Sequence, residues 1–335
     1  MNFQEALLLY NTAPLVDLMA TAHALRLTQP TIKAPIVTWQ IDRNINTTNV
    51  CVGGCKFCAF HCRLAQRDKA YVTTMEEYRT KIAQTISLGG DQILLQGGMN
   101  PELKLDYYEH LFATLRAEFP SIKLHALGPA EVQFLARGAR LSVRETLQRL
   151  MAAGMASLPG AGAEILDNDW RKTFSPGKCS ATEWIQVMQT AHQMGLLSSA
   201  TMMYGYHDTP SLRIKHLFAI RDLQASTGGF RAFIAWPYQG PEAHSTMSDY
   251  LRMVAIARIV LDNVPNIQAS WLTVGRSAAQ MALHGGANDM GSIMIEENVV
   301  RSAGSTNTID ASGIQRTIVE AGFEPALRDQ AYNLL

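Results

Sequence analysis

The sequence predicts an α/β protein, a single (β/α)8 TIM-type barrel with helical extensions at its N- and C-termini. Two observations support this prediction. Apolar runs of β-type residues alternate with segments whose apolar residues recur every three or four positions, and most of the runs end in Gly, Pro, Asn or Asp. The chain has 335 residues, 47% of them hydrophobic, which is enough for eight βα units around one core.

Each predicted strand is a short apolar run bounded by turn residues. The eight runs are residues 36–44, 92–96, 123–126, 155–158, 199–204, 230–236, 267–272 and 290–294. The helices predicted between them include residues 75–88, 105–118, 142–153, 181–194, 211–226 and 248–263. In such a barrel the reactive groups lie at the carboxyl ends of the strands.

Residues 1–30 are predicted to form an N-terminal helical extension, and residues 31–335 a single barrel domain that includes the C-terminal helices. Glu5 and Asp17 interrupt the apolar pattern of the N-terminal segment, which indicates an amphipathic helix. Both this helix and residues 314–335 are expected to pack against the outside or the bottom of the barrel. Neither segment is expected to carry chemistry.

The charge balance argues against a nucleic-acid or membrane partner. Lys and Arg number 29 and so do Asp and Glu, so the formal net charge is zero. No apolar stretch approaches the ~20 residues that cross a bilayer. We expect a cytoplasmic protein with a small-molecule substrate.

Three of the five cysteines lie in one short segment after the first predicted strand. Cys51, Cys55 and Cys58 are separated by three and then two residues, so one loop can wrap a cube-shaped iron-sulfur cluster. Such clusters normally take four thiolates, so three would leave one iron open. A structural zinc site is the alternative, with His61 or Cys62 as a fourth ligand. Zinc sites usually have a second pair of ligands further along the chain, and this sequence has none.

Two further strand ends carry candidate cofactor contacts. Gln96, Gly97 and Gly98 close the second predicted strand, where the glycines can expose backbone groups to a ligand or simply form a turn. Glu164 follows the glycine-rich end of the fourth strand. Its carboxylate can accept hydrogen bonds from ribose hydroxyls or stabilise a helix N-terminus.

Polar residues at the other strand ends are candidates for proton transfer or substrate binding. Asp289, between apolar residues and glycine, is the first candidate for a buried proton acceptor, followed by His125 and Asp208. Asp208 has a second interpretation, as the cap of the following helix. The expected substrate contacts are Glu131, Tyr206, His207, Gln268, Ser270, Asn288 and Glu296.

The cysteine segment resembles the radical S-adenosylmethionine (SAM) superfamily, whose members share this spacing and an aromatic residue before the third cysteine, here Phe57. The resemblance implies a barrel of the radical SAM kind and a 4Fe-4S cluster. The open iron would bind the amino and carboxylate groups of SAM. One electron would then split SAM into methionine and a 5′-deoxyadenosyl radical, with contacts to SAM from Phe57, Gln96, Gly97, Gly98 and Glu164.

Longer strings are similar to the dehypoxanthine futalosine cyclases of the futalosine route to menaquinone. They are residues 42–46, 92–98, 158–160, 163–166, 175–179, 227–230, 261–271, 286–289 and 296–300. The resemblance implies that the adenosyl radical takes the ribose C4′ hydrogen of dehypoxanthine futalosine. The carbon radical would then add to the carboxylated aromatic ring, and loss of an electron and a proton would give the cyclic product.

The resemblance also implies an electron donor such as flavodoxin or ferredoxin. Two related radical SAM enzymes are alternatives, an aminofutalosine synthase and a deazaflavin-forming synthase. Outside that class, an iron-sulfur electron carrier or a zinc-stabilised binding module would use the cysteines without needing the glycine-rich strand ends.

Overall fold

The computed structural model describes residues 1–30, 34–66 and 68–335, and its parallel strands form one sheet. Across the sheet the order is β10-β1-β9-β8-β7-β6-β5-β4-β3-β2. The strands are β1 (Ile36–Gln40), β2 (Asp42–Asn46), β3 (Gln92–Gln96), β4 (Lys123–Ala126), β5 (Met155–Leu158), β6 (Leu197–Tyr204), β7 (Phe230–Pro237), β8 (Asn266–Gln268), β9 (Asp289–Ser292) and β10 (Glu324–Leu327).

The first extended segment closes the sheet into a barrel. Ile41 alone separates β1 from β2. β1 pairs with β9 and β10, whereas β2 pairs with β3 at the far end of the strand order. The segment that follows β9 also pairs with β2, because the Asn44 amide of β2 donates to the Glu296 carbonyl at 3.2 Å. One continuous segment thus joins both ends of the sheet, which confirms the predicted barrel.

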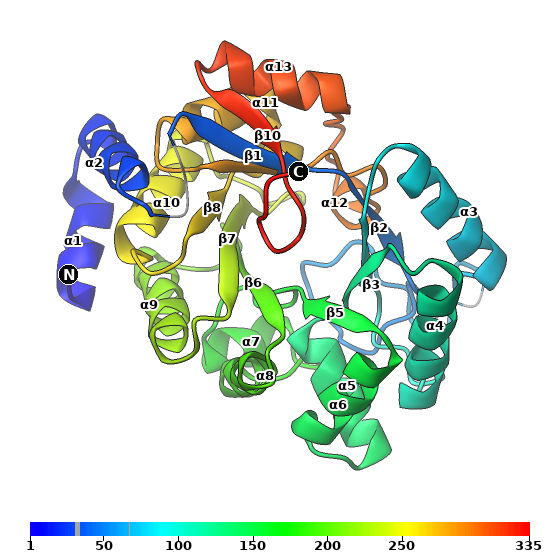
Figure 1. Cartoon of the computed structure of the whole chain (residues 1–335). Coiled ribbons are helices and arrows are strands. Elements are labelled where there is room, and N and C mark those ends of the chain that lie inside the picture. Colours follow the sequence, from blue (N-terminus) through cyan, green and yellow to red (C-terminus); the bar gives the residue numbers. More distant parts are fainter. Residues whose placement is uncertain (31–33, 67) are drawn as a thin grey trace.

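Helices surround the barrel (Figure 1). They are α1 (Phe3–Thr12), α2 (Leu15–Leu27), α3 (Met75–Ser87), α4 (Leu105–Glu118), α5 (Pro129–Ala139), α6 (Val143–Ala153), α7 (Asn168–Phe174), α8 (Ala181–Gln193), α9 (Pro210–Thr227), α10 (Met247–Val260), α11 (Trp271–Leu283), α12 (Val299–Ser302) and α13 (Ala311–Glu320). Capping boxes start several of them, as with Ser142 and Glu145 at α6. The core lies between strands and helices: Ile93 and Leu95 of β3 are buried there, while Leu94 faces inward.

Three expectations about the elements were wrong. The N-terminal segment forms two helices, because Pro14 stands between α1 and α2. Trp271, expected in the seventh strand, begins α11, since a short apolar run does not distinguish strand from helix. The C-terminal segment adds a strand, β10, whose sequence Glu-Pro-Ala-Leu lacks β-branched residues.

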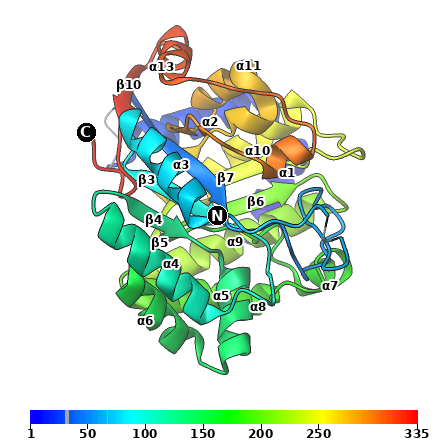
Figure 2. The ribbon, with the colours of Figure 1, turned by 90° about the vertical axis from the view of Figure 1, so that its right-hand side faces the viewer.

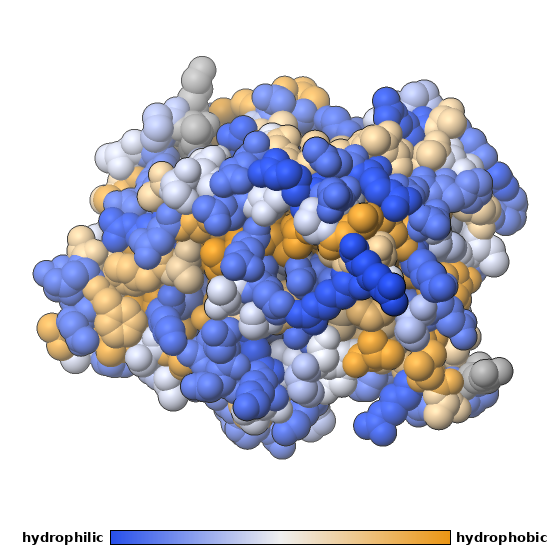
Figure 3. All heavy atoms as spheres, turned by 90° about the horizontal axis from the view of Figure 1, so that it is seen from below, coloured by the Kyte–Doolittle hydropathy of each residue, from blue (hydrophilic) through white to orange (hydrophobic). Residues whose placement is uncertain are grey.

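The two ends of the barrel carry different segments. The C-terminal tail crosses the opening that faces the viewer in Figure 1. Figure 2 shows the cysteine-bearing loop at the opposite end. Seen from below, hydrophilic side chains cover much of the surface, with apolar ones gathered near the middle (Figure 3). Among the described helices, none combines the length and the apolar character needed to cross a bilayer.

Candidate active site

A cavity of about 420 Å³ fills the interior of the barrel between the cysteine loop and the C-terminal tail. That volume is within the range typical of small-molecule sites. Thirteen of the residues singled out from the sequence line it. They are Cys51, Cys55, Phe57, Cys58, His61, Gln96, Gly97, Gly98, His125, Glu131, Glu164, Gln268 and Ser270.

The cysteine loop (residues 51–58) is held in a shape that suits thiolate ligands. The amides of Gly53 and Met99 each donate to the Cys51 sulfur at 3.3 Å. Such contacts stabilise negative charge on sulfur. Burial raises the pKa of Cys55 to about 11, with the nearby Lys178 ammonium acting in the opposite direction. The Cys55 thiol is therefore protonated at neutral pH when no metal is bound, and it would lose that proton on binding a positively charged metal centre.

The donor set fits an iron-sulfur cluster better than a zinc ion. In the described ranges, no group of three or more His, Cys, Asp or Glu side chains is close enough to hold a single ion. In a 4Fe-4S cluster each thiolate binds a different iron, so the three sulfurs need not converge on one point as the ligands of a single ion do. The Cys62 thiol is turned to the carbonyl of Gln66 at 3.2 Å, and the Cys62 carbonyl accepts from the Cys51 amide at 3.0 Å. Cys62 therefore supports the loop through its backbone.

The glycines at the end of β3 allow close packing against the cysteine loop. A Cβ on Gly98 would lie 2.1 Å from the Val50 carbonyl oxygen, so only glycine fits. The Gly98 amide donates to the Thr48 carbonyl at 2.8 Å, and the Gly97 amide donates to Glu131 Oε1 at 3.1 Å. The expectation that the glycines expose backbone groups is therefore wrong for these two amides.

Lys178 is a site residue that sequence reasoning missed. Its Nζ donates to Glu164 Oε1 at 2.6 Å and lies 5.6 Å from the centre of the Phe57 ring. The preceding Gly177 amide donates to the Gly53 carbonyl at 2.9 Å, which seats this segment on the cysteine loop. The Ser-Pro-Gly-Lys string was visible in the sequence, but nothing local indicated its position beside the cysteines.

Asp42 is a second missed residue, at the deep end of the cavity. Its Oδ2 accepts from the side-chain amides of Gln40 and Gln92, each at 3.1 Å. Its Oδ1 is buried and has no hydrogen-bond partner in the described part of the chain. Burial raises the pKa of Asp42, so this carboxyl binds a proton more readily than one in water.

His125 and Glu131 also line the cavity. The Nδ1 of His125 lies 2.7 Å from the Ser157 hydroxyl oxygen, and burial lowers the pKa of His125 to about 3. The imidazole is therefore neutral and a weak base. Burial raises the pKa of Glu131 to about 8.

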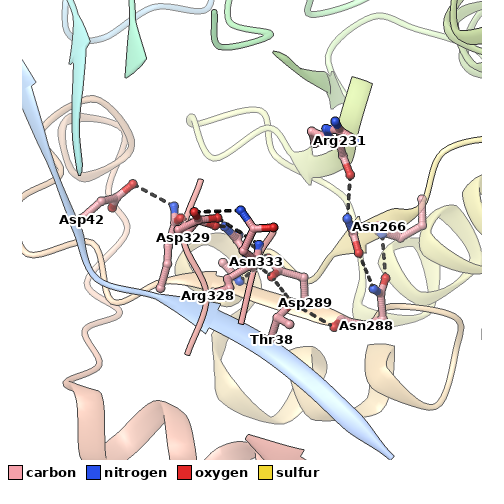
Figure 4. A network of polar contacts seen from close by, with 12 residues as sticks. Thr38, Asp42, Arg231, Asn266, Asn288, Asp289, Arg328, Asp329 and Asn333 are labelled. Carbon is pink, nitrogen blue, oxygen red and sulfur yellow. Dashed lines mark hydrogen bonds and ion pairs between the residues drawn. The ribbon is translucent and has the colours of Figure 1, made fainter. Parts of the chain in front are cut away.

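Asp289 does not face the cavity, which corrects its expected role. It forms a buried two-point ion pair with Arg328, with distances of 2.6 Å to Nε and 3.0 Å to Nη2. It also accepts from the Thr38 hydroxyl at 2.6 Å (Figure 4). The Gly291 amide donates to its other oxygen at 2.7 Å. With these donors in place, Asp289 is a structural counter-ion. Arg328 itself lines the cavity, so the C-terminal tail contributes to the site, contrary to expectation.

Asn288 is likewise part of the wall behind the cavity. Its Oδ1 accepts from Arg258 Nη2 at 2.7 Å and from the Ile267 amide at 2.9 Å. Its Nδ2 donates to Asn266 Oδ1 at 2.8 Å (Figure 4). All its polar atoms are used, so the expected substrate contact is wrong.

Four other expected residues lie outside the cavity. Asp208 accepts from the Tyr206 amide at 3.0 Å and pairs with Arg213, so it fixes the turn before α9. The centre of the Tyr206 ring lies 5.8 Å from the centre of the Phe57 ring, so Tyr206 packs against the cysteine loop.

His207 is exposed and lies 3.3 Å from Glu242. Glu296 pairs with Lys81 at 2.6 Å. The sequence could not separate Tyr206, His207 and Glu296 from cavity residues, because their partners come from distant parts of the chain. The partners of Asp208 are within five residues, in keeping with the structural interpretation that the sequence allowed.

Comparison with known proteins identifies the family. The model of the radical SAM superfamily matches residues 45–219, and that of the CofH/MqnC C-terminal region matches residues 227–335. The chain is 45% identical to the cyclic dehypoxanthine futalosine synthase of Streptomyces coelicolor, over 99% of this chain and 85% of the relative. It is 40% identical to the synthase of that name from Halalkalibacterium halodurans, over 100% of this chain and 91% of the relative.

The chain is also similar to proteins with other names. A 5-amino-6-(D-ribitylamino)uracil–L-tyrosine 4-hydroxyphenyl transferase of Archaeoglobus fulgidus is 38% identical, over 89% of both chains. The crystal structure of methylornithine synthase (PylB) matches with a TM-score of 0.74 at 17% identity, over 97% of this chain and 94% of that one. With its three free thiols at the mouth of a barrel, the chain belongs to the radical SAM superfamily, within the family that contains the cyclic dehypoxanthine futalosine synthases.

Proposed function

We propose that this enzyme converts dehypoxanthine futalosine to its cyclic product. The observation that carries the proposal is the identity of 45% and 40%, over nearly the whole chain, to two synthases named for that product. The cavity supports it, because cysteines, a buried carboxyl and apolar walls enclose a volume suited to a nucleoside.

Cys51, Cys55 and Cys58 would hold the 4Fe-4S cluster. Bound there, the cluster and SAM would supply a 5′-deoxyadenosyl radical able to take the ribose C4′ hydrogen. Phe57, Gln96, Gly97 and Gly98 line the same cavity as the cysteines and would bound the space for SAM. The Lys178–Glu164 ion pair suits the carboxylate and hydroxyl groups of SAM.

The substrate would occupy the middle and the floor of the cavity. Glu131, Gln268 and Ser270 provide hydrogen-bonding groups along its walls. His125, neutral because burial lowers its pKa to about 3, orients the substrate by hydrogen bonding.

Asp42 is the best placed acceptor for the proton lost from the ring. Its raised pKa and its unpartnered Oδ1 are the properties expected of a buried general base. We therefore assign this role to Asp42 and not to Asp289 or Asp208, whose carboxylates are paired with Arg328 and Arg213.

A low-potential donor such as reduced flavodoxin or ferredoxin would deliver the electron, which suits a reaction in the cytoplasm. The test is an anaerobic incubation of the reconstituted, reduced enzyme with SAM and dehypoxanthine futalosine. We expect 5′-deoxyadenosine and a product lighter than the substrate by two hydrogens. If 5′-deoxyadenosine forms without that product, the assigned substrate is wrong. A parallel incubation with tyrosine and 5-amino-6-(D-ribitylamino)uracil then tests the activity for which the 38% identical relative is named.

A further inference from the structure

Arg231 enters the cavity because the pairing of β6 with β7 shifts at that point. Ser198 pairs with Phe230 and Ser199 with Ala232, so Arg231 is an extra residue between two paired positions. Such a bulge redirects a side chain. Arg231 consequently lines the same cavity as Ala232 and Ile234, although strict alternation would send it outward.

A buried asparagine pair holds this bulge in place. Asn266 Nδ2 donates to the Arg231 carbonyl at 2.7 Å, and Asn288 Nδ2 donates to Asn266 Oδ1 at 2.8 Å. Asn288 is itself anchored by Arg258 at 2.7 Å. Figure 4 shows the contacts of Asn266 with Arg231 and with Asn288, which fix the Arg231 backbone and leave its guanidinium out of the network.

The charge of Arg231 differs from that of the other two cations that line the cavity. Lys178 is paired with Glu164, and Arg328 is paired with Asp289. The Nε of Arg231 is buried, and no described residue accepts a hydrogen bond from it. A partly buried charge without a counter-ion is costly, so this position favours an anionic ligand.

The position of Arg231 also indicates which part of a ligand it meets. Arg231 stands at the start of β7, and Trp236, at the other end of the strand, also lines the cavity. Five residues of strand span roughly 16 Å, so the guanidinium lies far from the cysteine loop. A ligand with one end near the cysteines would therefore present its opposite end to Arg231. One planar guanidinium matches one carboxylate in a two-point hydrogen bond.

We propose that Arg231 binds the carboxylate on the aromatic ring of the substrate at the floor of the cavity. This assignment rests on the proposed function, because it takes dehypoxanthine futalosine as the ligand. Arg231 would fix the ring so that its reacting carbon faces the ribose. The asparagine pair would be a positioning device for that contact.

The test is equilibrium binding to the anaerobically reconstituted, unreduced enzyme. The ligands are dehypoxanthine futalosine and an analogue in which hydrogen replaces the ring carboxylate. For Arg231→Gln we expect affinity for the acid to fall about 10- to 100-fold, as for loss of a hydrogen-bonded charge, and affinity for the analogue to stay unchanged. Arg231→Lys should lose less. Arg144→Gln, at an exposed arginine, is the matched control and should bind both ligands like the wild type. Equal affinity loss for both ligands, or none for the acid, would overturn the assignment.

A second ligand pair separates this assignment from the proposed function. The pair is 3-acetylbenzoate and acetophenone, which differ only in the carboxylate. If the wild type fails to bind dehypoxanthine futalosine but binds 3-acetylbenzoate in an Arg231-dependent way, the substrate is wrong and the anion site stands. If 3-acetylbenzoate does not bind, or binds equally well to Arg231→Gln, the assignment of an anion site to Arg231 is wrong. Thermal unfolding gives a check on structure. Arg231→Gln should not lower the melting temperature, since no described ion pair is broken.

Discussion

Asp289→Asn tests the conclusion that Asp289 stabilises the fold and does not accept the proton. The side chains of Asp289 and Arg328 are 0% and 2% exposed. Removing one partner of such a buried pair costs about 3–5 kcal/mol, because the other charge is left uncompensated. The unfolding entropy for 335 residues is about 0.7 kcal/mol/K, from ~2.1 cal/mol/K per residue. The variant should therefore melt roughly 4–7 °C below the wild type.

The assay is thermal unfolding of the anaerobically reconstituted protein, with a double-mutant cycle. Arg328→Met alone should cost a similar amount, because it leaves Asp289 unpaired. The double variant should be more stable than the sum of the single effects predicts, by about 1–3 kcal/mol. Below its melting temperature, Asp289→Asn should keep the wild-type ratio of product to 5′-deoxyadenosine. An unchanged melting temperature, together with 5′-deoxyadenosine formed without product, would refute this account and restore Asp289 as the proton acceptor.

Three other predictions concern the cavity. Asp42→Asn should leave 5′-deoxyadenosine formation intact and slow product formation about 100-fold, as for loss of a general base. In the wild type the rate of product formation should rise as the pH passes through the raised pKa of Asp42. A rate that does not change with pH would count against Asp42 as the base. Gly98→Ala should lower the iron bound after reconstitution, because its Cβ would meet the Val50 carbonyl, whereas Gly138→Ala, with nothing within 4 Å, should bind iron normally. Burial raises the pKa of Glu131 to about 8, so the folded protein keeps a proton that the unfolded chain loses near its ordinary value. Stability of the metal-free protein should therefore fall as pH rises from about 4.5 to 8, and Glu131→Gln should reduce that fall.

Local signals account for what the sequence predicted correctly. The hydrophobic periodicity of the sequence located most of the strands. Because the cysteine loop and Gln268 were predicted at the ends of strands, they were expected at one cavity, and both line it. The spacing of Cys51, Cys55 and Cys58 is itself local, so no knowledge of distant partners was needed. The rest depended on contacts between distant residues. Asp289 was misassigned because its partner Arg328 lies 39 residues further on, in a tail expected to carry no chemistry.

Conversely, the residues missed from the sequence have no local signature. Asp42 differs from the buried Asp289 in its partners, because side-chain amides of two glutamines, and no arginine, donate to its carboxylate. Arg231 enters the cavity through a register shift between two strands, which no hydrophobic pattern reveals. Lys178 gains its significance from Glu164 and from the cysteine loop on which it sits.

Transfer of an isotope from the substrate tests the central claim most directly. The reduced enzyme is incubated with SAM and dehypoxanthine futalosine that carries deuterium at C4′ of the ribose. The account predicts that the deuterium appears in 5′-deoxyadenosine and is absent from the cyclic product. Unlabelled 5′-deoxyadenosine together with a product that retains the deuterium would contradict it.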